Sequence, residues 1–489
     1  MKSLIKKITQ NEIIVNTLYV IFLLIAFGFI ILTRELSDLD EIWNFGFGLN
    51  VSEGLAPYKD FNMIITPFSS FLSAAVLGVF GRKLIVLRIF SVVLSAAAIF
   101  VLYKIIVKMG ISRSRAAMYG LLAVILFNTV FRYDYNFLCM LLLLILIYIQ
   151  LCSIDGFSVK AEIAIGFVAG LCAVTKQSTG LFICMGIAIQ SIVCCGKGFL
   201  KSWLYRILGG GTVLAALLIY MLAAGNLADF YDFAFAGIKT FTNENNYISF
   251  LINGDVIEKT VGVGAPIVTA AFIIHTVRRK EKRKVNLTVL IMCLCGAVVM
   301  YPICDSAHFF IAVLPFMIML AATVRIKPSG IEMSAACIAV MYLFVFAKTY
   351  LFMPTGDIIN CRLNRYENIP ISTSLNSTVE EVDKYILTSR EQGKRVIICD
   401  TAAQAYMIPC NIYNKVYDLP NIGNFGTKKP VEYAQDLVDS PDTKVLLLRN
   451  PEYLNRQFPT EMRECILHNM TKTGEVSIFD VYEVVRENG

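Results

Sequence analysis

Polar residues of the types that move protons and bind phosphate stand at four places beside long apolar runs of this chain. They are Asp40 with Glu41, Asp134, Lys176, and Asp305 with His308. A carboxylate in a partly desolvated pocket can take a proton from a hydroxyl group as a general base. An ammonium group can bind a phosphate and stabilise the negative charge that develops as the phosphate leaves. The four places are therefore candidates for proton transfer and phosphate binding.

The two acidic places each have a chemical and a purely structural interpretation. Asp40, with Glu41 beside it, could be a general base, or it could cap the helix that follows. Asp134 could bind an acceptor or help to hold a divalent cation, or it could pair with Arg132 and anchor a tight turn. The sequence does not decide between these alternatives, and it does not decide whether a metal ion takes part.

The two basic places have the same double interpretation. Lys176 interrupts two apolar runs, where it could bind a lipid-linked phosphate or extend its ammonium to lipid headgroups. His308 could donate to a phosphate or handle a proton, or it could pair with Asp305 at a helix start. The chain has no phosphate-binding glycine loop, no Ser-His-Asp order and no nucleic-acid footprint. A nucleotide-sugar donor on the cytoplasmic side is therefore not supported.

These residues are positioned by apolar runs that are long enough to cross a membrane. Hydrophobic residues make up 56% of the chain and charged residues 17%, and the mean hydropathy is +0.64. About twenty apolar residues in a helix span the hydrocarbon core of a bilayer. The runs predict an all-α polytopic membrane protein of about eleven transmembrane helices. The predicted spans are 13–33, 84–107, 116–131, 136–153, 161–175, 179–195, 206–225, 260–277, 286–304, 309–325 and 331–352.

The segment from Thr66 to Phe80 is apolar but short, and it contains Pro67 and Gly78. It predicts an interfacial or re-entrant helix in the first outer loop. With the N-terminus in the cytoplasm, lysine and arginine outnumber acidic residues in the inner loops, and acidic residues outnumber them in the outer loops. This bias predicts that the four polar places lie on the outer side of the membrane.

The chain changes character after Phe352, where the apolar runs shrink to strand length. Residues 395–400 and 444–449 predict strands, and a last strand is expected near 475–485. Residues 379–390 and 461–470 predict helices. The sequence therefore predicts a transmembrane domain over residues 1–352 and a small extracytoplasmic α/β domain over residues 353–489.

The first 325 residues or so resemble the C-type (GT-C) glycosyltransferases that use polyprenyl-phosphate-linked sugars, in particular the aminoarabinose-transferase and rhizobial galacturonosyltransferase branch. The residues that carry the resemblance are, in order, Asp40-Glu41, Gly54-Leu-Ala-Pro-Tyr-Lys-Asp-Phe61, Pro67, Gly81 with Arg88, Asp134, and Thr175-Lys176. Thr66 departs from the pattern, because the aminoarabinose branch usually has a basic residue before the proline. The part of the donor site that holds the phosphate is therefore expected to differ.

The resemblance implies that Asp40 is the catalytic carboxylate, with Glu41 and Asp134 as further acids. It implies that Lys176, His308 and Arg88 contact the donor phosphate. The implied reaction is inverting transfer of a sugar from a polyprenyl-phosphate carrier to an envelope glycan, lipid or protein, at the plasma membrane of a bacterium. No cofactor is certain, a divalent cation stays open, and the partners include membrane lipids but no nucleic acid. The alternatives are a transporter or flippase of a lipid-linked glycan, and a non-catalytic envelope-assembly protein.

Overall fold

The computed structural model describes residues 12–36, 39–195, 198–237, 247–301, 303–324, 328–329, 332–334, 337–338, 341, 357–400, 402–409, 425–450 and 459–484. The chain forms two compact units, and each unit is assembled from segments that are distant in sequence. The first unit comprises Met1–Thr33, Arg88–Leu217 and Asn243–Phe352, and the second comprises Arg34–Leu87, Leu218–Thr242 and Met353–Gly489.

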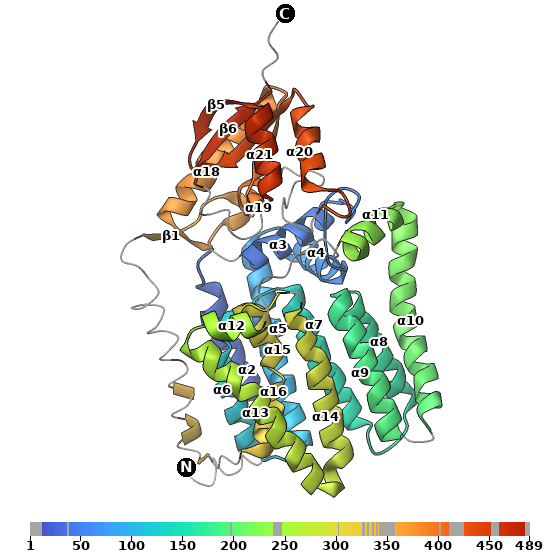
Figure 1. Cartoon of the computed structure of the whole chain (residues 1–489). Coiled ribbons are helices and arrows are strands. Elements are labelled where there is room, and N and C mark those ends of the chain that lie inside the picture. The colour runs from blue at the N-terminus through green and yellow to red at the C-terminus, as the bar shows by residue number, and fades with distance from the viewer. Residues whose placement is uncertain are drawn as a thin grey trace, which may run out of the picture. The chain divides into compact units, whose positions relative to one another are not determined.

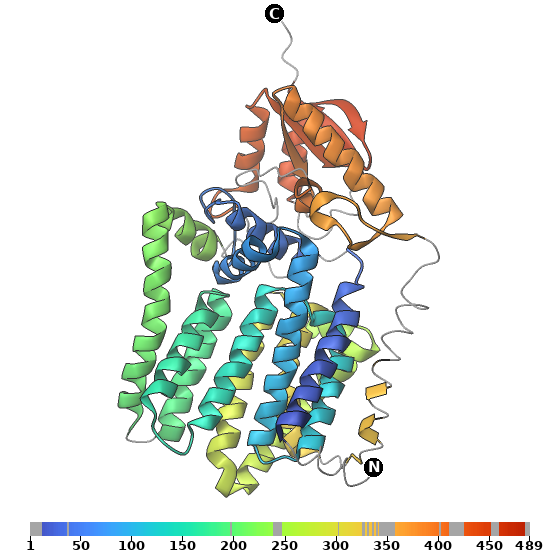
Figure 2. The ribbon, with the colours of Figure 1, turned by 180° about the vertical axis from the view of Figure 1, so that it is seen from behind.

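The first unit is a bundle of helices, which Figure 1 and Figure 2 show from opposite sides. Its helices are α2 (Glu12–Leu32), α5 (Leu84–Lys108), α6 (Arg113–Leu126), α7 (Tyr135–Cys152), α8 (Val159–Ala173), α9 (Gln177–Cys195), α10 (Phe199–Ala224), α12 (Tyr247–Asn253), α13 (Val256–Arg278), α14 (Arg283–Gly296), α15 (Ser306–Val313) and α16 (Phe316–Thr323). One end of α5 and one end of α10 belong to the second unit. Within the bundle α7 packs on α8, α8 on α9, and α9 on α14. The chain reverses direction at each turn, so the start of α7, the end of α8 and the start of α9 lie at one end of the bundle.

Seven of the described helices are long and apolar enough to cross a membrane, or eight if the bent pair α15 and α16 is one span. The predicted multi-pass membrane protein is confirmed. The predicted spans 116–131 and 161–175 fall on α6 and α8, which have 14 and 15 residues. The predicted span 331–352 lies almost wholly outside the described residues, so the total of eleven stays a prediction.

The predicted span 309–325 is not one straight helix, because its two halves are bent by 48° at a short break. Pro315 stands at this break and precedes α16. A proline has no backbone N–H to donate and its ring obstructs the preceding turn, so it bends or ends a helix. The bend therefore has a local cause in the sequence.

Glycines let α8 and α10 approach each other closely. A Cβ atom at Gly166 would lie 1.9 Å from the carbonyl oxygen of Arg206, and one at Gly209 would lie 2.1 Å from that of Ile163. Small residues at such contacts are typical of helix pairs in membranes, where close packing replaces the hydrophobic driving force. The contact holds Arg206 against α8.

The second unit combines short helices with two sheets. Its elements are α3 (Leu39–Ser52), α4 (Phe68–Phe80), α11 (Leu227–Tyr231), β1 (Ile358–Asn360), β2 (Pro370–Ser372), α18 (Thr373–Glu391), β3 (Arg395–Cys399), α19 (Ala403–Met407), α20 (Pro430–Val438), β4 (Thr443–Leu448), α21 (Thr460–Asn469), β5 (Thr471–Val476) and β6 (Phe479–Glu483). Strands β1 and β2 pair antiparallel, and the larger sheet has the order β3-β4-β6-β5. Only β3 and β4 are parallel in this described sheet.

Most sequence predictions for this unit agree with the structure. The segment around Pro67 forms α4, and the strands predicted at 395–400 and 444–449 are β3 and β4. The single strand predicted near 475–485 is instead the second half of a hairpin, β5 and β6, because the chain turns at Ser477 with a left-handed φ of 48°. The domain boundary at residue 353 stays a prediction.

Candidate functional site

A buried polar cluster lies at one end of the first unit, where Asn136, Lys176 and His308 meet. Asn136 is in the first turn of α7, Lys176 is the last residue before α9, and His308 is in the first turn of α15. These residues expose 0%, 5% and 9% of their surface. The structure thus brings together two of the predicted phosphate-binding residues.

Asn136 connects the members of this cluster. The ammonium of Lys176 donates to Asn136 Oδ1 at 2.8 Å and to the carbonyl oxygen of Val299 at 2.8 Å. Asn136 Nδ2 donates to Asp134 Oδ1 at 3.1 Å and lies 3.3 Å from His308 Nε2. Because a lysine can only donate, the amide oxygen must face Lys176 and the amide nitrogen must face the other two groups.

This arrangement also assigns the tautomer of His308. Asn136 Nδ2 is a donor, so the Nε2 atom that faces it accepts. The other ring nitrogen, Nδ1, lies 2.8 Å from Asp305 Oδ1 and donates to that carboxylate. His308 therefore carries its proton on Nδ1, and its ring is held between an amide and a carboxylate.

Asp134 holds the start of α7. It is the N-cap residue, and its Oδ1 accepts from the backbone N–H of Asn136 at 2.7 Å. Its Oδ2 lies 3.7 Å from a guanidinium nitrogen of Arg132, and Asp134 is 1% exposed. Of the two interpretations of Asp134, this geometry matches the ion pair that anchors a turn.

Asp305 caps α15 and orients His308. Its Oδ1 accepts from the backbone N–H of His308 at 2.9 Å as well as from the ring. Burial raises the pKa of the Asp305 carboxyl, but the hydrogen bonds from the ring and the backbone N–H of His308, with the positive charge of Arg132, lower it more. The pKa of Asp305 consequently lies below its ordinary value of 3.8.

The remaining predicted site residues are not among the hydrogen-bond partners of Asn136 in the described part of the chain. Asp40 and Glu41 belong to the second unit, in the first turn of α3, where Asp40 is half-buried and Glu41 is buried. The backbone carbonyl of Asp40 accepts from Asn44 Nδ2 at 2.8 Å. Arg88 is in α5 of the first unit and is 1% exposed. No group of three or more His, Cys, Asp or Glu side chains that could hold a metal ion occurs among the described residues.

A second buried polar network, which the sequence did not predict, lies near the other end of the same helices. Arg206 Nε donates to Glu162 Oε2 at 2.5 Å, and Arg206 also donates to Gln190 Oε1 at 3.2 Å and to Ser191. Gln190 in turn donates to Thr288 at 3.3 Å. At about 1.5 Å per residue, Gln190 lies about 20 Å along α9 from its start. The signal in the sequence was one charged residue at the start of each of two apolar runs, Glu162 in 161–175 and Arg206 in 206–225.

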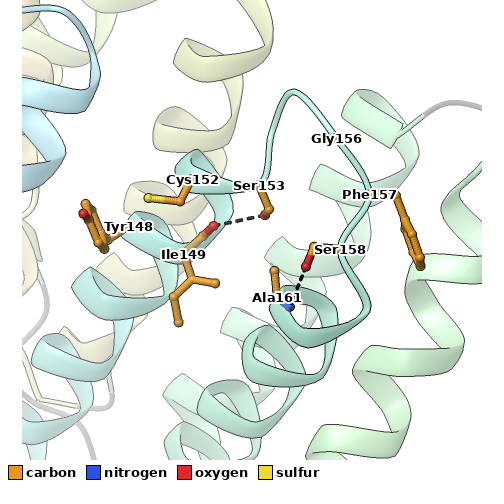
Figure 3. A pocket seen from close by; sticks show the side chains of 8 residues that line it. All are labelled: Tyr148, Ile149, Cys152, Ser153, Gly156, Phe157, Ser158 and Ala161. Atoms are coloured by element: carbon orange, nitrogen blue, oxygen red, sulfur yellow. Dashed lines mark hydrogen bonds between the residues drawn. The ribbon is translucent and has the colours of Figure 1, made fainter.

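A pocket of about 410 Å³ lies at the turn between α7 and α8 (Figure 3). Ser153 donates to the carbonyl oxygen of Ile149 at 3.0 Å, and Ser158 accepts from the backbone N–H of Ala161 at 3.4 Å. These hydroxyl groups serve the ends of the two helices. The pocket is at the end of α7 opposite to Asn136, so it is separate from the polar cluster.

No protein-family model and no curated protein sequence matches this chain. Solved structures do match, and one is ArnT, an aminoarabinose transferase, from Cupriavidus metallidurans in the apo state. It is 12% identical, with a TM-score of 0.63, and the match covers 96% of this chain and 97% of that chain. The chain has the ArnT fold. The predicted fold class, a helical membrane bundle with a small sheet-containing part toward the C-terminus, is therefore confirmed.

The ArnT fold is also seen in a structure of the same enzyme with a ligand. ArnT from Cupriavidus metallidurans bound to undecaprenyl phosphate is 11% identical, with a TM-score of 0.53, and the match covers 96% of this chain and 98% of that chain. A weaker similarity, to the protein O-mannosyltransferase Pmt1-Pmt2 complex of S. cerevisiae bound to its sugar donor, has a TM-score of 0.34 at 17% identity. It covers 47% of this chain and 37% of that chain.

Proposed function

We propose that this chain is an integral membrane glycosyltransferase that moves a sugar from a polyprenyl-phosphate carrier to an extracytoplasmic acceptor. The observation that carries the proposal is the ArnT fold over 96% of the chain, because an ArnT structure holds undecaprenyl phosphate. The acceptor is a glycan, lipid or protein of a bacterial cell envelope. In this proposal the N-terminus is cytoplasmic, and the residues after 352 are extracytoplasmic.

Lys176 and His308 are proposed to act on the donor phosphate, with Arg88 as a further cation. The ammonium of Lys176 is almost fully buried and is held by two acceptors at 2.8 Å each. A buried cation that is already oriented stabilises a phosphate leaving group without reorganising during the reaction. The fixed ring of His308 supplies a second polar group at the same end of the bundle.

Asp40 is proposed as the general base, with Glu41 as its neighbour. The acceptor hydroxyl loses its proton to the Asp40 carboxylate while its oxygen bonds to the anomeric carbon of the sugar. The bond from that carbon to the phosphate oxygen breaks, and the carrier phosphate leaves. A single displacement of this kind inverts the anomeric centre. Asp134 supports the reaction by anchoring α7, since its carboxylate already serves Arg132 and Asn136.

The test is a transfer assay with the purified protein in lipid nanodiscs. A panel of labelled undecaprenyl-phosphate sugars is offered with envelope lipids, glycans and peptides, and the parent is compared with Asp40→Asn. We expect transfer by the parent and a loss of at least about 100-fold in Asp40→Asn, the usual effect of removing a general base. Transfer that survives in Asp40→Asn would reject Asp40 as the base. A folded parent that binds donors but transfers no sugar would reject the enzyme.

One observation favours a second candidate function, transport of a lipid-linked sugar. The buried ion pair between Glu162 and Arg206 lies away from the cluster around Asn136, within the same set of helices. Ionisable side chains inside a membrane are costly and often mark the path of a substrate or ion. Movement of a fluorescent lipid-linked sugar across the bilayer of proteoliposomes, without any acceptor, would support transport over transfer.

A further inference from the structure

The C-terminal segment of the second unit makes three contacts with α3 (Leu39–Ser52) and the residues directly before and after it. The backbone N–H of Leu36, just before α3, donates to the carbonyl oxygen of Pro370 at 2.8 Å. The rings of Phe45 and Tyr366 lie 6.4 Å apart between centroids. The contact beyond the end of α3 is an ion pair, in which Arg365 donates to Glu53 at 2.7 Å. We call Arg365, Tyr366 and Pro370, together with Gln404, the α3 clamp.

Gln404 makes the closest contact of this clamp. A Cβ atom built at Gly46 would lie 1.9 Å from Gln404 Oε1 and 2.9 Å from its Cδ, so any side chain at position 46 would require the Gln404 side chain to shift. Gln404 is on α19 and is 4% exposed, and its Oε1 has no hydrogen-bond partner among the described residues. A buried acceptor without a partner costs free energy. The amide end of Gln404 lies against α3 at Gly46.

The clamp is joined to the larger sheet of the same unit. The hydroxyl of Tyr366 donates to the carbonyl oxygen of Ala405 at 3.2 Å, which ties the segment before β2 to α19. α19 in turn follows strand β3, which is fully buried except at its first residue. The side chain that touches Gly46 is therefore supported by the core of the sheet, and α3 rests on a rigid element.

We propose that the α3 clamp is a positioning element for Asp40 and Glu41, which stand in the first turn of α3. This inference rests on the proposed function of Asp40. Gly46 lies about 9 Å along the helix from Asp40, at about 1.5 Å per residue. A helix moves as a rigid body over this length, so the depth that Gln404 sets at Gly46 also sets the place of the carboxylates. A misplacement of about 1 Å at a catalytic group can cost about 100-fold in rate.

The experiment compares Gly46→Ala with the double variant Gly46→Ala/Gln404→Ala in lipid nanodiscs. Hydrogen exchange of residues 39–52 reports whether α3 is held, and kcat and KM for transfer report whether the carboxylates are in place. We expect Gly46→Ala to speed exchange in α3 and lower kcat by at least about tenfold, with KM for the donor little changed. Removing the Gln404 side chain should restore both to within about threefold of the parent, because the new methyl group then has room.

Gly78→Ala is the matched control, since Gly78 is a helical glycine of α4 with nothing within 4 Å of an added Cβ. It should change neither exchange in α3 nor kcat. Should Gly46→Ala fail to fold, the ion pair gives an independent test. Arg365→Glu should lower kcat, and adding Glu53→Arg should restore it.

Three outcomes would overturn the inference. Faster exchange in α3 with unchanged kcat would mean that the clamp is structural only. Unchanged exchange and kcat in Gly46→Ala would mean that Gln404 does not hold α3. A parent that transfers no sugar would remove the proposed function and the positioning role together, while the exchange measurement would still show whether the contact between Gln404 and Gly46 holds α3.

Discussion

Asn136 Oδ1 accepts a hydrogen bond from Lys176 Nζ at 2.8 Å, and this bond ties the first turn of α7 to the turn between α8 and α9. The same amide also faces Asp134 and His308, so one side chain orients an acid, a lysine and a histidine. An amide suits this place because it presents an acceptor and a donor at once. No other uncharged side chain of this size could serve Lys176 and His308 together.

Asn136→Leu should lower sugar transfer by at least about tenfold, because the Lys176 ammonium and the His308 ring both lose the group that orients them. It should also lower the free energy of unfolding by about 1–3 kcal/mol, the cost of leaving buried polar groups without a partner. The control is Gln150→Leu, a buried amide near the other end of the same helix. It should leave transfer unchanged, and an equal loss of transfer in both variants would show that the effect is only on folding.

Lys176→Met keeps most of the side-chain volume and removes the charge, so it separates packing from phosphate binding. We expect the affinity for undecaprenyl phosphate to fall by at least about tenfold, since a charge-assisted hydrogen bond is lost. Binding is measured by the quenching of a labelled carrier in nanodiscs. Lys201→Met is the control, because Lys201 is exposed and its ammonium lies over the ring of Phe157. Equal binding by the parent and Lys176→Met would remove Lys176 from the donor site.

Asp134→Asn tests whether Asp134 anchors a turn or acts as a catalytic acid or base. Asparagine is as good an N-cap residue as aspartate, so the start of α7 should persist. Only the charge opposite Arg132 is lost, and we expect transfer to fall by less than about tenfold. The same change at Asp40 should cost at least about 100-fold. Rates that fall equally in the two variants, with both proteins folded, would give Asp134 a direct part in the chemistry.

The sequence predicted the helices of the bundle and the presence of Lys176 and His308 at one end of it. An apolar run of sufficient length indicates a membrane span directly. Because successive spans cross the membrane in opposite directions, the residues that follow every second span lie at the same end of the bundle. The sequence did not predict the role of Asn136. Nothing in the sequence around Asn136 distinguishes it from an ordinary residue in the first turn of a helix. Its hydrogen bonds to Lys176 and His308 depend on how three helices pack.

The contact between Gly46 and Gln404 was hidden for a similar reason. Gly46 stands in a helix of the first loop, where a glycine has no obvious local use, and Gln404 stands in a short helix after β3. Periodicity assigns each residue to its element, but it holds no information on which elements touch. The hairpin of β5 and β6 was not predicted for a local reason. Its turn places Ser477 in a left-handed conformation, which is usual for glycine or asparagine, so the residue types in the turn do not indicate it.

Asp305→Asn should destabilise the protein in a way that depends on pH. The folded pKa of Asp305 lies below its ordinary value of 3.8, so its ionised form stabilises the fold above that value. This contribution is lost as the pH falls through the folded pKa. The gap in apparent melting temperature between parent and variant should be full above about pH 5 and shrink as the pH falls below 3.8. The pH dependence of the gap should be smaller in a His308→Gln background, where only the backbone N–H of residue 308 and Arg132 still lower the pKa. A gap that grows as the pH falls would contradict the assignment.

Arg206→Met should be strongly destabilising, because it leaves the Glu162 carboxylate buried without its partner. Breaking such a buried pair costs about 3–5 kcal/mol, whereas replacing both members by apolar side chains is often neutral. We therefore expect Glu162→Leu/Arg206→Met to recover most of the stability, as measured by thermal unfolding in detergent. A glycosyltransferase should keep its transfer rate per folded molecule in the double variant to within about twofold, since the pair lies far from Asn136. A transporter that moves its substrate along this network should instead lose transport in the stable double variant, so the same protein decides between the two functions.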